Sequence, residues 1–290
     1  MGLRIKSNVE SLVAQRQLSQ NRSEMGDSLE KLASGLRINR SADDAAGLAV
    51  SESMRARIRG LAQAKRNAND GISLLQVAEG SMGEFNNILV RMRELTTQAA
   101  SDTVAPKERT YLNREFEQLN EELVRIKDDT QFNGIKIFSG EQENDLGIQV
   151  GINPPSEGDE SAGVIRIKLD SVADLNQAIS DLPQSIEGDT GQTLGGGDTA
   201  DIFTAIDGAM DKVTDFRASL GALQSRMNSA ITTIDVSSEN MSAAVSRIRD
   251  VDYASETARL AQSKILTAAS TSVLAQANQT PETVLTLLRG

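Results

Sequence analysis

Paired carboxylates are the main candidates for acid–base chemistry in this sequence of 290 residues. The sequence contains no histidine and no cysteine, so no imidazole base, thiolate nucleophile or His/Cys metal site can form. Adjacent carboxylates occur at 43–44 (Asp-Asp), 121–122 (Glu-Glu) and 128–129 (Asp-Asp). Adjacent residues on a helix point in different directions, and no active-site pattern accompanies any pair. We therefore predict that the protein is not an enzyme and has no cofactor and no metal site.

The charge distribution is uneven along the chain. The sequence has 30 basic and 41 acidic residues, a formal net charge of −11, and its basic concentration lies at Arg37, Arg40, Arg55, Arg57, Arg59, Lys65 and Arg66. No aromatic residue interleaves this group, and only 3% of the chain is aromatic, whereas single-stranded nucleic acid is bound by basic and aromatic residues together. We predict no nucleic-acid partner and assign the group to a solvated helix face or to contacts between subunits.

The sequence carries no signal for membrane insertion or cleavage. No stretch of 18 apolar residues is long enough to span a bilayer, and the first residues, MGLRIKSNVESL, lack the apolar run of a cleaved signal peptide. We therefore expect any export to proceed without a cleaved signal peptide.

Helix-breaking residues divide the chain into three parts. The five prolines lie at 106, 154, 155, 183 and 281, and 11 of the 22 glycines fall between 134 and 197. We predict a helix over about 42–100, which Ser41 caps together with Asp44, and another over about 106–129, where proline suits the first turn. The middle is expected to hold a small β region over about 130–170 and a short variable loop over about 154–200.

Both proline-free parts show a heptad repeat of apolar residues, which is typical of coiled-coil packing. We predict that these positions pack the subunit and support assembly: Leu61, Leu75, Met82 and Leu89 in the first part, and Val213, Leu220, Met227, Ile234, Met241 and Ile248 in the second. Between them, residues 135–138, 146–150 and 165–169 alternate apolar and polar side chains. These three segments predict a small, half-buried sheet.

The two ends carry apolar residues but do not have enough of them to form a stable core of their own. Within the first 40 residues, nine large apolar side chains between Leu3 and Leu32 form a loose helical stripe, and residues 265–281 carry no charge. Burying such a stripe does not reliably offset the backbone entropy of ordering the segment. We expect the ends to become ordered by packing on each other and on neighbouring copies, with contributions from Val273, Leu274, Leu285 and Leu288.

Six strings in the sequence resemble the bacterial flagellin family. They are LASGLRINRSADDAAGLAVSESMRARIRGL (32–61), NANDGISLLQVAEGSM (67–82), VRMRELTTQAA (90–100), TQFNG (130–134), ENMSAAVSRIRDVDYASETARL (239–260) and VLAQANQTPETVLTLLR (273–289). The resemblance covers roughly residues 1–153 and 200–289, in the family's order and at both ends.

This resemblance implies a mainly α subunit of the bacterial flagellar filament, which serves swimming motility. Its fold would be a long antiparallel coiled-coil-like helical rod built from both termini, with a small β-hairpin region in mid-chain. Residues 1–42 and 252–290 would form terminal helices of the filament's inner layer and drive assembly. Residues 43–251 would form the helical domain, without a large outer domain.

The resemblance also implies partners and a location. The chain would bind further copies of itself and other flagellins in an extracellular filament, and would contact the flagellar export apparatus, a C-terminal export chaperone, and the filament cap and junction proteins. A host innate immune receptor would contact the positions that match Arg91, Leu95 and Glu115. The alternative role for these three residues is contact between neighbouring subunits alone.

Two other classes of protein compete with a filament subunit. A hook–filament junction protein of the flagellum shares flagellin-like ends but does not polymerise extensively, so micrometre-long filaments of the purified chain would distinguish the two. A coiled-coil adaptor has comparable heptads but does not need the charge-free segment 265–281, and it would form a short bundle in solution.

Overall fold

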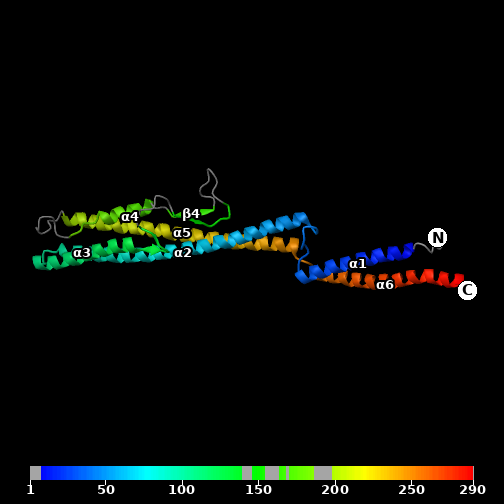
Figure 1. Ribbon diagram of the computed structural model, residues 1–290. Helices are drawn as coiled ribbons and strands as arrows, with labels where there is room; N and C mark the ends of the chain where they lie inside the picture. The colour runs from blue at the N-terminus through cyan, green and yellow to red at the C-terminus, as the bar shows by residue number, and fades with distance from the viewer. Residues whose placement is uncertain (1–7, 139–145, 154–162, 168–169, 186–197, 290) are drawn as a thin grey trace. The chain divides into compact units, whose positions relative to one another are not determined.

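The computed structural model describes residues 8–138, 146–153, 163–167, 170–185 and 198–289 (Figure 1). It describes the side chains of these residues except at 170–171, 198–199 and 280–289. Six helices and four short strands follow one another in this part of the chain, so the prediction of a mainly α fold with a small mid-chain β region is confirmed. The residues group into two compact units, Met1–Ile58 with Glu239–Gly290, and Arg59–Ser238.

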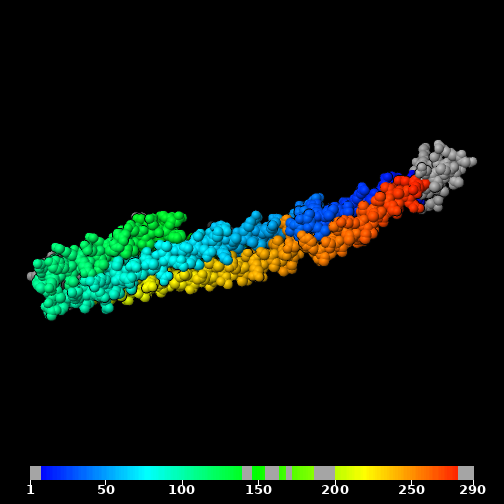
Figure 2. All heavy atoms as spheres, turned by 90° about the horizontal axis from the view of Figure 1, so that it is seen from below, coloured from blue at the N-terminus to red at the C-terminus, as the bar shows by residue number. Residues whose placement is uncertain are grey.

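The first unit is built around the helices α1 (Val9–Ser34) and α6 (Tyr253–Arg289), which lie side by side (Figures 1 and 2). They run antiparallel, because Asn8 contacts Ala277 at one end and the hydroxyl of Tyr253 donates to the carbonyl of Leu32 at the other. Asn8 caps α1 by accepting a 3.0 Å hydrogen bond from the backbone N–H of Ser11.

Glycine at position 35 ends α1. Gly35 has φ +73°, a left-handed conformation that favours glycine, and its N–H donates to the carbonyl of Lys31 over 2.9 Å. The segment after it is tied to the end of α5 (Asp198–Arg249), since Arg37 N–H donates to the carbonyl of Arg249 and Val251 N–H donates to the carbonyl of Gly35. These two hydrogen bonds therefore hold the helix break after α1 beside the break between α5 and α6.

The helix α2 (Ala45–Ala99) begins three residues later than predicted. Asp44 caps it by accepting a 2.9 Å hydrogen bond from the N–H of Gly47, so the prediction that Ser41 is the cap is wrong. The breaks at 35–44 and 250–252 lie near the domain boundaries expected at 42/43 and 251/252, whereas the compact units divide at 58/59 and 238/239. The expected boundaries remain a prediction.

The second unit packs α2 and α5 together with α3 (Pro106–Asp129) and α4 (Asp170–Ser180) around one apolar core. Most heptad positions are at most 6% exposed, and all of these except Leu61 and Ile234 belong to this core: Leu61, Leu75, Met82, Leu89, Val213, Leu220, Met227 and Ile234. Met241 and Ile248, in the first unit, are half-buried. The eight buried side chains fill space inside the chain and expose little surface to a neighbouring copy.

Three phenylalanines join the elements of this core. Phe138 has no exposed surface and meets Phe85 of α2 and Phe216 of α5 edge to face, with ring centroids 6.2 and 6.1 Å apart. Edge-to-face pairs at such distances are favourable beyond the area they bury. A chain with only six phenylalanines thus concentrates half of them at one point.

The β region consists of two separate antiparallel ladders, so the prediction of a single sheet is wrong. In the first, β1 (Gln131–Phe132) pairs with β2 (Ile135–Lys136) through a two-residue turn in which Asn133 and Gly134 both have positive φ. In the second, β3 (Leu146–Gln149) pairs with β4 (Val164–Ile167), with Ile148 opposite Ile165.

The second ladder lies against α2. Asn67 donates a 3.0 Å hydrogen bond to the carbonyl of Gln149. A Cβ atom at Gly71 would lie 2.5 Å from Ile148 Cδ1 and 3.0 Å from Met227 Sδ. The first of these distances is shorter than real Cβ atoms adopt. Glycine at 71 therefore lets the strand pair approach the helix.

The region expected to be a loop at 154–200 contains the helix α4. Its apolar residues Val172, Leu175 and Ile179 are at most 3% exposed and belong to the core. Their spacing of three and four residues is the helical period, and it predicts this helix once the segment is considered alone. The expected loop also contains β4 and the start of α5, and its segments 154–162, 168–169 and 186–197 lie outside the described residues.

Candidate assembly surface

The contact between α1 and α6 follows a heptad repeat of small and polar residues. We call these residues the polar seam. They are Ser11, Ala14, Asn21 and Ser28 on α1 and Glu256, Ser263, Ser270 and Ala277 on α6. On each helix they recur every seven residues or at the heptad's three-residue step, which keeps them facing one partner helix.

Side-chain hydrogen bonds fix the register of the polar seam. Asn21 Nδ2 donates to Ser270 Oγ over 3.0 Å, and Ser11 Oγ donates to Asn278 Oδ1 over 2.8 Å. A hydrogen bond contributes only about 0.5–1.5 kcal/mol net, and small side chains bury little apolar surface. The pair is therefore specified in register but receives little of its stability from an apolar core.

Some large apolar residues of α1 and α6, among them Leu18, Met25 and Leu274, are half-buried beside the polar seam, whereas others are exposed. We call seven of them the terminal apolar residues. They are Val9, Leu12, Val13 and Leu29 on α1 and Ile265, Leu266 and Val273 on α6, and each is 41–69% exposed. We expected the apolar stripe of the first 40 residues to pack the two ends on each other. Only Leu18, Met25 and Leu32 of that stripe are half-buried on α1, and the fully buried positions of the contact are small or polar.

The predicted assembly residues of α6 differ in exposure. Val273 is 59% exposed and Leu274 is half-buried beside the polar seam. Leu285 and Leu288 lie on the described helix backbone, but their side chains lie outside the described residues.

The residues matched to receptor contact lie on α2 and α3. Arg91 pairs with Glu115 at 2.8 Å and with Glu94 at 3.0 Å, and the hydrogen bond to Glu115 is the main cause that raises the pKa of the Arg91 guanidinium. Leu95 has no exposed surface and belongs to the core. Its side chain therefore has no exposed surface for the apolar contact that we expected one turn after Arg91.

The adjacent carboxylates serve local structure. Asp43 accepts the backbone N–H groups of Arg40 and Asn39 at 2.9 and 3.0 Å, and these hydrogen bonds lower the pKa of its carboxyl. Asp129 pairs with Arg125 at 3.3 Å. Among the described residues no group of three or more His, Cys, Asp or Glu residues could hold a metal ion, and no described helix is long and apolar enough to cross a membrane.

The polar seam is the feature that the sequence interpretation missed. Residues 11, 14, 18, 21, 25 and 28 already alternate steps of three and four along the sequence, and 256, 260, 263, 267, 270, 274 and 277 do the same. This repeat mixes serine, alanine and asparagine with Leu18, Met25 and Leu274, so the pattern of large apolar side chains alone does not reveal it. The signal was present in the spacing of small residues.

Comparison with known proteins identifies the family. The model of the bacterial flagellin N-terminal helical region matches residues 5–143, and that of the C-terminal helical region matches residues 203–288. The two matches contain α1, α2 and α3 and nearly all of α5 and α6, and so include all of the terminal apolar residues.

Similar proteins match along almost their whole length. A flagellin of Halalkalibacterium halodurans is 45% identical over 98% of this chain and 99% of its own. A flagellin of Bacillus subtilis is 40% identical over 99% of this chain and 100% of its own. A flagellar filament 33 kDa core protein of Treponema phagedenis is 37% identical over 98% and 99%. The chain belongs to the bacterial flagellin family.

Proposed function

We propose that the terminal apolar residues drive polymerisation of this chain into the helical flagellar filament used for swimming. As a flagellin, the chain is a structural filament subunit and not an enzyme. The observation that carries the proposal is the outward exposure, by 41–69%, of seven large apolar side chains on a helix pair with a polar seam. Such residues lose their contact with water when another chain covers them, and in a filament that chain is another copy.

The physics of association supports this role. Burial of the terminal apolar residues stabilises the polymer and leaves the monomer unchanged, so assembly is coupled to concentration by mass action. A contact between two different surfaces of identical copies does not close on itself and produces a helical polymer.

Removal of the end of α6 tests the proposal. Deleting residues 270–290 removes Val273, Leu274 and the last part of the polar seam. We expect a soluble, largely helical monomer that forms no filaments in seeded solutions viewed by electron microscopy, beside full-length protein that forms filaments many subunits long. Normal filaments from the deleted chain would contradict the proposal, and short, closed assemblies of the full-length chain would favour the junction protein.

We propose further that α6 is covered before assembly by a C-terminal export chaperone and that the flagellar export apparatus delivers the chain outside the cell without a cleaved signal peptide. The exposed Ile265, Leu266 and Val273 support this, because an uncovered apolar surface favours premature association. The filament cap, the junction proteins and other co-assembling flagellins would contact the same terminal helices.

A host innate immune receptor is the remaining proposed partner. Arg91 and Glu115 are about half exposed and support a polar contact on α2 and α3, while the burial of Leu95 restricts that contact to them. We expect Arg91→Ala monomers to lose potency in a receptor-signalling assay without loss of helix content. Unchanged potency would contradict the proposed contact.

A further inference from the structure

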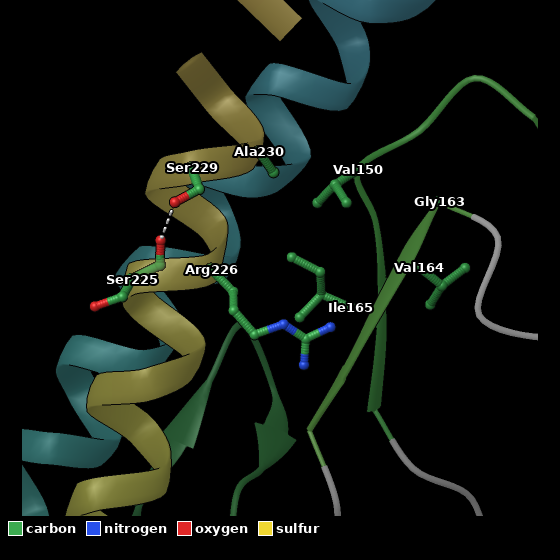
Figure 3. A pocket seen from close by; sticks show the side chains of 8 residues that line it. All are labelled: Val150, Gly163, Val164, Ile165, Ser225, Arg226, Ser229 and Ala230. Atoms are coloured by element: carbon green, nitrogen blue, oxygen red, sulfur yellow. Dashed lines mark hydrogen bonds between the residues drawn. The ribbon is translucent and has the colours of Figure 1, made fainter. Parts of the chain in front are cut away.

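A groove of about 460 Å³ lies between the second ladder and α5 in the second unit (Figure 3). Its walls are apolar, with Val150, Val164 and Ile165 on the ladder side and Ala230 on the helix. Arg226 extends from α5 toward β4, and Ser225 and Ser229 lie beside it on the helix. The groove therefore combines an apolar wall with one cationic group and two hydroxyl-bearing residues.

Arg226 has no partner for its charge among the residues that the structure describes. It makes no ion pair or hydrogen bond with any of them. By contrast, Arg125 pairs with Glu122 and Arg259 with Glu256, each within one helical turn. Residues 222–230 of α5 contain no carboxylate that could do the same for Arg226.

The strands that line the groove add no negative charge. Residues 146–150 are uncharged, and the only charged residue in 163–167 is Arg166. The described lining of the groove thus carries a positive charge on a chain with a net charge of −11. An apolar wall beside an uncompensated guanidinium suits a carboxylate on an apolar stem, because arginine binds carboxylates through a planar fork of donors.

We propose that this groove receives an Asp or Glu side chain of a second copy of this chain, so that Arg226 forms a contact between subunits. The inference rests on the proposed polymerisation, which brings copies together and supplies carboxylates from 41 acidic residues. The contact joins two different surfaces, which is the kind that a helical polymer requires. It is separate from the terminal apolar residues, since it lies in the second unit.

A charge reversal with a matched control tests the contact. Arg226→Glu places like charges together, and we expect the critical concentration for polymerisation to rise about tenfold or more. Arg217→Glu makes the same change in net charge at an exposed position of the same helix outside the groove, and we expect less than a twofold change. Circular dichroism melting of both monomers should match that of the unaltered chain.

Several outcomes would overturn the proposal. An unaltered chain that does not polymerise would overturn both the proposed function and this inference. If the unaltered chain polymerises and Arg226→Glu does so equally well, or if both reversals impair it equally, only the inference about the groove fails.

Photo-crosslinking identifies the occupant directly. We would place p-benzoylphenylalanine at Ser229 in the groove and irradiate assembled filaments. The expected product is a covalent dimer in which the linked peptide of the second copy contains Asp or Glu. The absence of dimers in filaments, or links within one copy alone, would contradict a carboxylate from a neighbouring subunit.

Discussion

Ile265 offers the sharpest test of the terminal apolar residues. It is 69% exposed on α6, and full burial of such a side chain contributes about 1.5–3 kcal/mol. If a neighbouring copy covers the exposed fraction, Ile265→Ser should weaken each subunit's association by about 1–2 kcal/mol. Because 1.4 kcal/mol corresponds to a factor of ten, the critical concentration should rise about 5- to 30-fold.

The assay measures the subunit concentration that remains after seeded assembly is complete. Since Ile265 is exposed in the chain, the free energy of unfolding of the monomer should change by less than about 0.5 kcal/mol. The control is Ala269→Ser, an exposed position on the same helix with little apolar surface to lose. An unchanged critical concentration for Ile265→Ser, or an equal rise in the control, would refute the reasoning.

Three further changes test the fold beneath this surface. Phe138→Ala removes the ring between two others in the core and should lower the free energy of unfolding by about 3–5 kcal/mol in urea titrations. Gly71→Val introduces a Cβ 2.5 Å from Ile148 Cδ1 and should destabilise by about 1–3 kcal/mol, whereas Gly83→Ala, where the space is open, should not destabilise in the same titration. Because backbone hydrogen bonds lower the pKa of Asp43, its carboxylate stabilises the first unit at neutral pH. This stabilisation is lost as the pH falls through the pKa of Asp43 in the folded chain. Asp43→Ala should therefore reduce the slope of the free energy of unfolding against pH below about 4.

The sequence predicted the long helices because large residues carry their pattern. The bounds expected for the third helix, about 106–129, agree with α3, and the heptad residues from Leu61 to Leu89 are buried as a regular repeat predicts. Pattern alone could not tell packing inside the chain from packing between copies. An apolar side chain at a heptad position serves either equally well, and only the position of α5 shows that these residues are already covered.

The terminal helices show the opposite case. The sequence pattern predicts a buried stripe that includes Val9, Leu12 and Val13, but these side chains are exposed. The contact with α6 is occupied instead by Ser11, Ala14 and Asn21. Hydrophobicity predicts that such residues are buried somewhere, but the identity of the covering chain lies outside a single sequence. The missed helix α4 has a simpler cause, since the glycines around it outweighed the apolar period within it.

The central claim is that neighbouring copies cover the terminal apolar residues in the filament. The chain contains no cysteine, so a single introduced thiol reports exposure without interference. Val273→Cys, at a position 59% exposed, should react rapidly with a maleimide in the monomer, and Ala14→Cys in the polar seam should react slowly there. We predict that the thiol at 273 becomes strongly protected when the chain assembles, and an equal rate of labelling in monomer and filament would contradict the account.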